Sequence, residues 1–405
     1  MLPLEIIDHI FSFLQSDSLT LEKCSKAHPL LSELVPKYLY ANITIRVPSD
    51  VSRLSELASD NLIANYVRNL KLNLVWSVHE SSGRRLLDQE KIALVLPKFR
   101  MLRGIALHVG DDPTTKWPLL HERFREAFTQ CLRLPSMIEV SILGTSEFPL
   151  TTFRNCTSIK KLALGGELFD FDVSSSDSSS SSPQIESLSL YRCQRSSSAI
   201  ISWAKTCSPR SLRFSLPSDF GLLQSLAPIY SNTLVSLELD LGTACMSFTH
   251  FHDDFYKLFN CPFPSSPFLD QSRSNLPPPS LFRCPPHKVE DLIIHALISF
   301  HHGDRDYDTP LPMIASFVTS APSLKRLTLD IRSWFHGTFF LGEFDWSPLS
   351  LLCSSSLESI KLHVTKIMFG NVPSGDPLPC LEGNTDLMRM VKQGLLTIKT
   401  EEHFI

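Results

Sequence analysis

The sequence lacks the features that mark several large classes of protein. Its 405 residues carry a formal net charge of -4, so the basic surface of a nucleic-acid-binding protein is missing and we expect no nucleic-acid partner. No apolar run approaches the roughly 18 residues of a membrane-spanning helix, and no signal-peptide pattern stands at the N-terminus. The ten cysteines include no C-x-x-C pair, and scattered single cysteines are typical of a reducing compartment. We therefore expect a cytoplasmic or nuclear protein with no membrane partner.

Enzyme signatures are also missing. The sequence contains no G-x-x-x-x-G-K-[ST], G-x-G-x-x-G, G-x-S-x-G or H-E-x-x-H pattern. The densest group of metal-ligand residue types is His250-x-His252-Asp253-Asp254, which lacks a fourth partner at a recurring spacing. A solvated loop or helix start is favoured over a metal site there. We expect no catalytic residue, no metal and no cofactor.

A short helical segment, residues 1–46, opens the chain. Pro3 suits the first turn of a helix, because that position needs no backbone N–H. The apolar residues of this helix cover an arc of roughly 160°, wider than one packed face requires, so we expect them to bury surface both within a bundle and against a partner. They are Ile6, Ile7, Ile10, Phe11, Phe13 and Leu14. Asp17 and Ser18 are suited to cap a second helix, and a third is expected from Pro29.

The same segment carries the residues of a known motif. They are, in order, Leu2-Pro3-x-Glu5-Ile6, Ile10, Leu14, Leu21, Cys24-Ser25-Lys26, Leu39-Tyr40, Ile43 and Ile45. This set resembles the F-box motif of fungal type, over about a tenth of the chain. The resemblance implies docking onto the Skp-type adaptor of an SCF ubiquitin ligase through Leu2, Pro3, Ile6, Ile7 and Ile10. The alternative is an ordinary amphipathic bundle that packs on the next domain.

A second pattern, apolar-x-x-apolar-x-apolar, repeats through the rest of the chain. Its middle positions are 22 to 35 residues apart, except for one spacing of 55. Alternating apolar residues predict a strand at each occurrence. In the sixth occurrence Ser211 takes the first apolar position. The ten occurrences are Val67/Leu70/Leu72, Leu102/Ile105/Leu107, Met137/Val140/Ile142, Ile159/Leu162/Leu164, Ile185/Leu188/Leu190, Ser211/Phe214/Leu216, Leu234/Leu237/Leu239, Val289/Leu292/Ile294, Leu324/Leu327/Leu329 and Leu357/Ile360/Leu362.

Helix-like stretches separate these predicted strands. A strand followed by a helix at this period is typical of a leucine-rich-repeat solenoid, and the pattern resembles the irregular repeats of F-box proteins. We predict an α/β fold with a short three-helix F-box and an irregular leucine-rich-repeat solenoid of about ten parallel strands. The alternative is an ordinary α/β domain with one parallel sheet. The predicted helices cover 86–99, 119–132, 199–207, 220–230 and 310–319.

The predicted organisation also includes loops and a terminal cap. The serine-rich tract 174–182 is expected to be a flexible loop, with a phosphorylation target as the alternative. The long spacing marks an insertion, 243–288, which is rich in proline and is expected to be a loop or, alternatively, a polyproline docking peptide. A helix over 386–393, stopped by Gly394, would cap the solenoid. The parts are the F-box 1–46, a connecting segment 47–65, the solenoid 66–370 and a C-terminal cap or tail 371–405.

The predicted function is binding without catalysis. Larger side chains on the exposed strand face stand in the later repeats, and the candidate substrate-binding residues are Ile293, His295, Arg326, Lys361 and His363. The leading hypothesis is a substrate receptor of an SCF-type ubiquitin ligase, which binds a Skp-type adaptor, through it a cullin, and an unidentified protein substrate. The alternatives are an adaptor-bound scaffold outside the cullin ligase and a free-standing repeat module for protein interaction.

Overall fold

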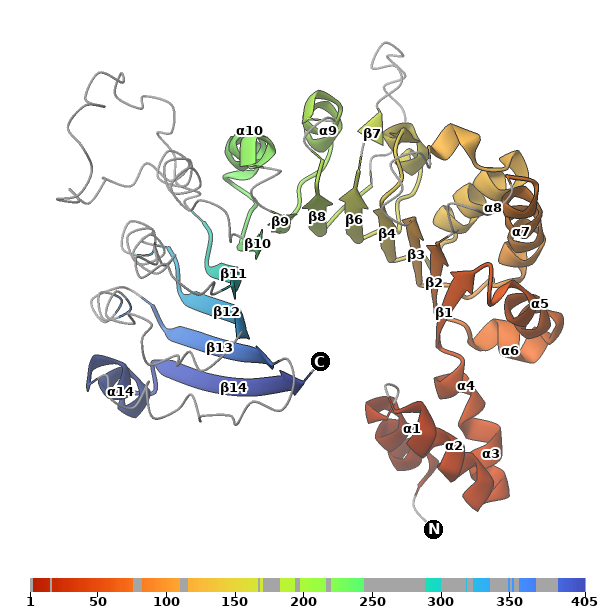
Figure 1. Cartoon of the computed structure of the whole chain (residues 1–405), viewed down its shortest axis with the longest axis horizontal. Coiled ribbons are helices and arrows are strands. Elements are labelled where there is room, and N and C mark those ends of the chain that lie inside the picture. Colours follow the sequence, from red (N-terminus) through yellow and green to blue (C-terminus); the bar gives the residue numbers. More distant parts are fainter. Residues whose placement is uncertain are drawn as a thin grey trace. The chain divides into compact units, whose positions relative to one another are not determined.

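The computed structural model of the chain divides into two compact units, residues 1–207 and 208–405. Within the described residues, twelve parallel strands follow one another in chain order, six in each unit, with helices between many of them (Figure 1). The fold is therefore α/β. The structure describes residues 3–14, 17–75, 82–109, 116–166, 168–169, 183–193, 197–215, 220–243, 288–299, 318, 323–335, 349, 352, 357–368 and 385–404.

Four short helices form the N-terminal module of the first unit. Asp17 caps the second helix, since its Oδ1 accepts the backbone N–H of Thr20 at 3.0 Å, and Pro29 opens the third. The core of the module is small and consists of Phe11, Leu21, Val35 and Tyr38. The helices are α1 (Leu4–Phe13), α2 (Ser18–Ala27), α3 (Pro29–Leu34) and α4 (Pro36–Leu39).

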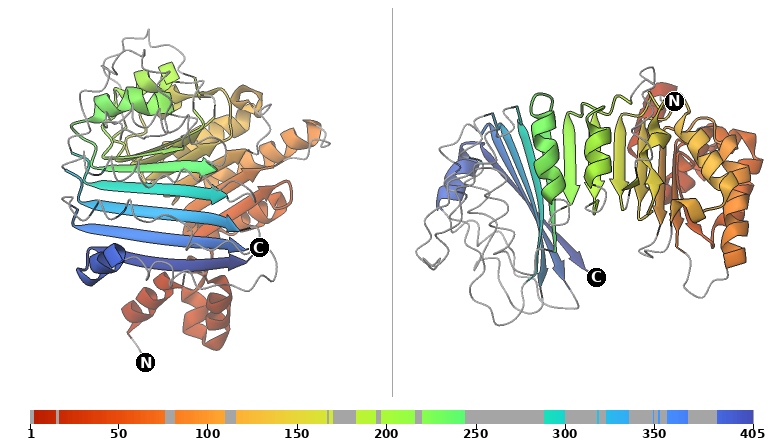
Figure 2. Two further views of the ribbon diagram at one scale, coloured as in Figure 1. Left: turned by 60° about the vertical axis from the view of Figure 1, so that its left-hand side comes forward. Right: turned by 90° about the horizontal axis from the view of Figure 1, so that it is seen from above.

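The six strands of the first unit pair in the order in which the chain makes them. Helices α5 (Val51–Ser59), α6 (Asn61–Tyr66), α7 (Ser82–Val95), α8 (Glu122–Leu132) and α9 (Ser197–Ala204) connect or follow them and lie along one face of the sheet (Figures 1 and 2). Two very short strands, β5 (Phe148–Pro149) and β7 (Leu168–Phe169), pair with each other and form a separate sheet. The six strands are β1 (Asn42–Val47), β2 (Asn69–Leu74), β3 (Gly104–Val109), β4 (Glu139–Leu143), β6 (Lys161–Gly165) and β8 (Ser187–Tyr191).

The strands are held in register by rows of buried apolar residues. One such row runs through Leu72, Leu107, Ile142, Leu164 and Leu190, which are successive pairing partners and fully buried. Because side chains alternate along a strand, the residues between them point to the opposite side. We call that side, which carries half-buried and exposed residues, the open face.

The second unit repeats this arrangement. Its strands pair in chain order. The helix before its final strand ends at Lys392, two residues before Gly394, whose φ of 72° is in the left-handed region that favours glycine. The elements are β9 (Ser211–Ser215), α10 (Phe220–Tyr230), β10 (Ser236–Thr243), β11 (Asp291–Ser299), β12 (Arg326–Phe335), β13 (Ser359–Met368), α14 (Thr385–Lys392) and β14 (Leu396–Phe404).

The ten predicted strands are all present, and the sheet has two that the pattern did not predict. These are β1, which begins inside the segment that resembles the F-box and ends one residue beyond it, and β14, inside the segment expected to be a cap or tail. Helices lie within or across the predicted stretches 86–99, 119–132, 199–207, 220–230 and 386–393. The serine-rich tract, most of the proline-rich insertion and most of the predicted helix 310–319 lie outside the described residues.

The predicted register of one strand was wrong. Leu212 and Phe214 of β9 are the buried partners of Leu237 and Leu239, so the repeat pattern there is shifted by two residues from Ser211/Phe214/Leu216. A shift of two residues leaves each side chain on its own face but changes its pairing partner, and the residue of β9 that pairs with Glu238 on the open face is Arg213. None of the helices in the described ranges is long and apolar enough to cross a membrane.

Candidate functional site

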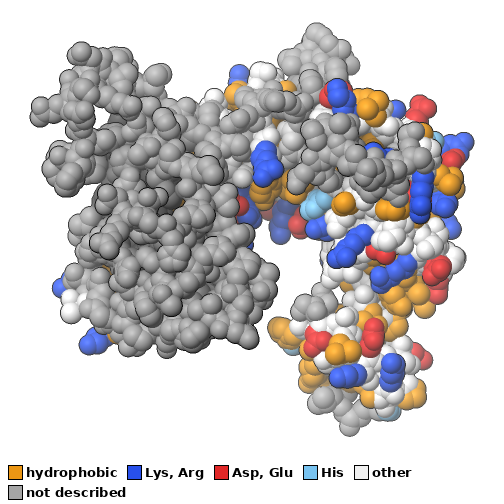
Figure 3. Space-filling model, viewed as in Figure 1, with side chains coloured by type: hydrophobic (Ala, Val, Ile, Leu, Met, Phe, Trp, Pro, Cys, Tyr) orange, Lys and Arg blue, Asp and Glu red, His pale blue; other side chains and the backbone are white. Residues whose placement is uncertain are grey.

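The first candidate surface is the outer side of α1. Phe11 is only 4% exposed, and Ile7 and Leu14 pack against the same core. In contrast, Ile6 and Ile10 are 46% and 44% exposed, and Phe13 is 73% exposed. These three residues, spaced by four and then three positions, share one side of a helix. We call them the α1 apolar face; apolar side chains on the surface of the N-terminal module are orange in Figure 3.

The predicted adaptor-binding residues do not all lie on the exposed side of α1. Ile6 and Ile10 lie on the α1 apolar face, and Pro3 is exposed at the start of α1. Ile7 is half-buried against the module's core, and Leu2 lies outside the described residues. Phe13 was not among the predicted docking residues, although its spacing of seven from Ile6 signals the same helix side.

A fixed core supports this outer surface. The rings of Phe11 and Tyr38 meet edge to face with centroids 5.8 Å apart, and the Tyr38 hydroxyl donates a hydrogen bond to the backbone carbonyl of Asp8 at 2.9 Å. Lys37 forms an ion pair with the Asp8 carboxylate, which lowers the pKa of that carboxyl. These contacts join α1 to α4, so the α1 apolar face belongs to a packed module.

The second candidate surface is the open face of the second unit. All five predicted substrate-binding residues stand on it. Ile293 and Lys361 are both register partners of Thr328, His295 and His363 both pair with Asp330, and Arg326 pairs with Asp291. Strand pairing therefore brings together residues from β11, β12 and β13.

At the centre of this surface, His295 lies between two carboxylates. Its Nε2 is 2.7 Å from Glu238 Oε1 and its Nδ1 is 2.9 Å from Asp330 Oδ2. Both nitrogens can donate only when the imidazole is protonated. The hydrogen bond with Glu238 is the main cause of a raised pKa at His295, and the hydrogen bond from His295 is the main cause of a lowered pKa at Glu238. The imidazolium is thus the form that suits this site.

Arginines complete the network around His295. Arg213 lies 3.0 Å from Glu238 and 3.9 Å from Asp240, and Arg332 lies 3.4 Å from Asp330. Three cations, counting protonated His295, therefore face three carboxylates. His295 was among the predicted binding residues, whereas Asp330 was not, and neither was Arg213, whose pairing with Glu238 the shifted register concealed.

Two of the five predicted substrate-binding residues already have anionic partners. His295 belongs to the network, and the guanidinium of Arg326 forms a two-pronged ion pair with Asp291 in which Nη2 lies 2.7 Å from Oδ2. Lys361 is exposed and makes no ion pair within the described residues. Within the described part of the second unit, Ile293, Lys361 and His363 are therefore the members of the predicted set without an ion-pair partner, and Lys361 is the exposed one.

The described cysteines include thiols with little tendency to ionise. Burial raises the pKa of Cys131 to about 12 and that of Cys207 to about 11. A thiol of such high pKa is a poor nucleophile at neutral pH. Among the residues that the structure describes, no group of three or more histidine, cysteine, aspartate or glutamate side chains is arranged to hold a metal ion.

Neither a protein-family model nor a curated protein sequence matches this chain. The interpretation of its two candidate surfaces therefore depends on their own chemistry.

Proposed function

We propose that this chain is a non-catalytic substrate receptor of an SCF-type ubiquitin ligase. In this proposal the N-terminal module docks onto a Skp-type adaptor and the parallel sheet binds the protein that is to be modified. The observation that carries the proposal is the α1 apolar face, which stays exposed although the module has its own core. It occurs in the segment whose residues resemble the F-box motif.

The α1 apolar face is large enough to contribute usefully to binding. Complete burial of one large apolar side chain contributes about 1.5–3 kcal/mol. Because Ile6, Ile10 and Phe13 are each about half exposed or more, covering the three would contribute about 3–4 kcal/mol. That corresponds to an affinity gain of roughly several hundredfold.

The parallel sheet suits the second task of a receptor, which is to hold the target protein. A receptor acts by holding its target close to the transferring enzyme, which raises the effective concentration without chemistry of its own. A binding surface on paired strands loses little conformational entropy when the target docks. Ile293, Lys361 and His363 are our candidates for contact with the target, because their side chains are not committed to ion pairs within the described residues.

The test is adaptor binding by a double variant, Ile6→Asp with Ile10→Asp, in the full chain. We expect it to lose binding to a purified Skp-type adaptor while the strands remain folded by circular dichroism. The matched control is Leu62→Asp on α6, because Leu62 is 62% exposed and lies outside the α1 apolar face. Retention of full adaptor binding by the double variant would sink the proposal.

Co-purification from cells distinguishes the proposed role from its alternatives. A substrate receptor brings down both the adaptor and a cullin. A scaffold outside the ligase brings down the adaptor alone, and a free-standing repeat module brings down neither.

A further inference from the structure

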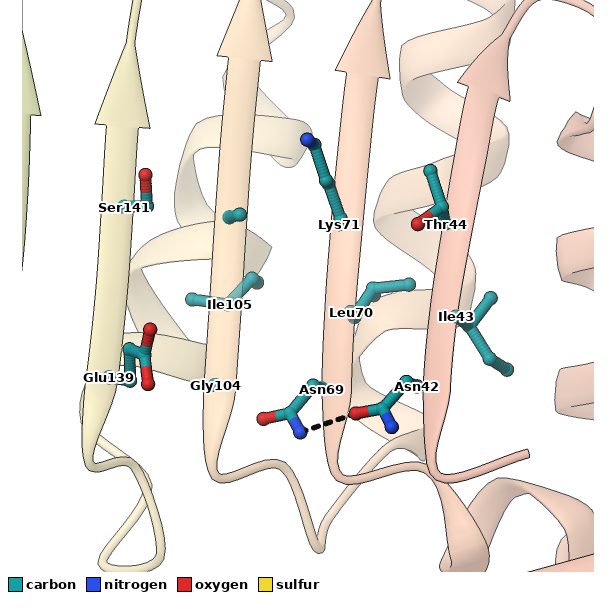
Figure 4. A pocket seen from close by; sticks show the side chains of 11 residues that line it. Asn42, Ile43, Thr44, Asn69, Leu70, Lys71, Gly104, Ile105, Glu139 and Ser141 are labelled. Atoms are coloured by element: carbon teal, nitrogen blue, oxygen red, sulfur yellow. Dashed lines mark hydrogen bonds between the residues drawn. The ribbon is translucent and has the colours of Figure 1, made fainter. Parts of the chain in front are cut away.

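The first unit has a cleft on its open face, over β1 to β4 (Figure 4). Its volume is about 290 Å³. Gly104 and Ala106 of β3 form a low floor, with Asn69 and Lys71 of β2 on one side and Glu139 and Ser141 of β4 on the other. The cleft is thus deepest over the small residues of β3 and polar at its sides.

The lining of the cleft carries two charged side chains, Lys71 and Glu139. This lysine is half-buried, leans toward β3 in Figure 4, and makes no ion pair within the described residues. Its register partners on both sides, Thr44 and Ala106, carry no charge. Glu139 stands at the lower end of the cleft, 4.0 Å from Lys161 Nζ on the neighbouring strand. Lys71 therefore presents a positive charge that an anionic group from outside would neutralise.

Below Lys71, two asparagines present amide groups to the cleft. Asn69 Nδ2 donates to Asn42 Oδ1 at 2.7 Å, which fixes the two side chains relative to each other. Gly104 makes this arrangement possible, because a Cβ at that position would lie only 2.4 Å from Asn69 Oδ1. The amide nitrogen of Asn42 and the amide oxygen of Asn69 remain as a donor and an acceptor, the groups that bind a peptide main chain.

The floor of the cleft continues along the sheet as a row of small residues. Ala106, Ser141, Ala163 and Ser189 are successive register partners on β3, β4, β6 and β8. Neighbouring strands are about 4.8 Å apart, so the distance from Lys71 on β2 to Ser189 on β8 is roughly 19 Å. At about 3.3 Å per residue, this row accommodates about six residues of extended chain.

We infer that this cleft binds an extended, acidic peptide segment of another protein. One carboxylate of the peptide pairs with Lys71, the amides of Asn42 and Asn69 bind its main chain, and the small residues let it lie close to the sheet. The inference uses the proposed function only to identify the peptide as part of a target protein. Single-stranded nucleic acid fits less well, since such sites combine several cations with aromatic stacking platforms, and the lining of this cleft has no aromatic ring.

The pKa of His108 should indicate whether a carboxylate is bound to Lys71. Its Nε2 lies 3.3 Å from the Ser141 hydroxyl, and its pKa is lowered, first by burial and second by the Lys71 ammonium. A carboxylate bound to Lys71 would cancel the second cause. The pKa of His108 is therefore expected to rise when an acidic peptide binds, and also to rise in Lys71→Gln without any peptide.

The experiment uses the full chain and four fluorescein-labelled probes, (Glu-Ser)4, (Gln-Ser)4, (Lys-Ser)4 and an eight-nucleotide oligothymidine. In fluorescence anisotropy we expect (Glu-Ser)4 to bind best and Lys71→Gln to weaken it by about tenfold or more. The matched control is Lys98→Gln, an exposed lysine in the short helical turn after α7, which should bind as the wild type does. Histidine NMR follows the pKa of His108, assigned with His108→Gln.

Three results would overturn the inference. They are equal binding of (Glu-Ser)4 by wild type and Lys71→Gln, tighter binding of oligothymidine than of (Glu-Ser)4, and a His108 pKa that (Glu-Ser)4 leaves unchanged. The variant Ile6→Asp with Ile10→Asp separates this inference from the proposed function, because it should lose the adaptor and keep the peptide. A chain that binds the adaptor but no acidic peptide would contradict only the inference.

Discussion

Two phenylalanines on α1 allow the stability of the N-terminal module and its binding to the adaptor to be tested separately. Phe11 is 4% exposed and Phe13 is 73% exposed, although they are two residues apart. Replacing a buried phenylalanine with alanine costs about 3–5 kcal/mol. Among the described residues the module's core has four buried members, and a segment of this size is marginally stable, so Phe11→Ala should unfold it.

Phe13→Ala should leave the N-terminal module folded and weaken its binding to the adaptor. An exposed substitution usually changes the free energy of unfolding by less than about 0.5 kcal/mol. If the adaptor covers the exposed part of the ring, the loss is about 1–2 kcal/mol, or roughly 5- to 30-fold in adaptor affinity. The separation of the two effects follows from which side of α1 each ring occupies.

Hydrogen exchange over residues 3–40 and calorimetric titration with a Skp-type adaptor measure the two effects in the full chain. We expect fast exchange in Phe11→Ala, and native exchange with weakened binding in Phe13→Ala. Equal loss of protection in both variants would refute the division of α1 into an inner and an outer side. Native exchange together with undiminished affinity in Phe13→Ala would show that the adaptor does not use the α1 apolar face.

The remaining predictions concern the sheets. Leu188→Ala, at a fully buried position of β8, should lower the free energy of unfolding in urea by about 2–5 kcal/mol, whereas Ser189→Ala on the open face should change it by less than about 0.5 kcal/mol; equal losses would contradict the alternation of faces. The raised pKa of His295 means that its pairing stabilises the second unit fully below the ordinary histidine value of 6.5, and this contribution disappears as pH rises through the raised pKa. The lowered pKa of Glu238 means that its contribution is complete above the ordinary value of 4.5 and disappears as pH falls through the lowered pKa. Urea unfolding of the second unit should therefore show a stability maximum between pH 4.5 and 6.5 that is weaker in His295→Gln, and an identical pH profile in the variant would rule this out.

The strands were predictable because each buries two or three apolar residues on one side. The pattern failed for β9 and β14, where residues of other types occupy some of the expected apolar positions. The repeat that contains β9 starts at Pro209, which is buried just before the strand, and continues with Leu212 and Phe214. The predicted pattern took Ser211 as its first position instead. In β14, Leu396 is buried but the strand continues through charged residues, so its sequence resembles a polar tail. Pairing with β13 along its length explains why it is nevertheless a strand.

The candidate surfaces were predictable to different degrees. The α1 apolar face follows from helical spacing within ten residues, and only Phe13 was overlooked. The environment of His295 depends instead on the pairing of strands that are distant in sequence. Glu238 precedes it by 57 residues and Asp330 follows it by 35, across segments whose lengths carry no information about register. A sequence pattern can therefore identify the histidine as a residue of the open face but cannot give it two carboxylate neighbours.

The partners of a charged residue decide what its substitution can reveal. Arg326 is paired with Asp291, so reversing the charge of Arg326 would create repulsion within the sheet as well as change any contact with a target. Weaker target binding by such a variant would therefore mix a structural effect with a binding effect. Lys361 and Lys71 make no ion pair within the described residues, so replacing either one removes a charge without leaving a carboxylate unpaired there. Variants of these two lysines are for this reason the more direct probes of where a target protein binds.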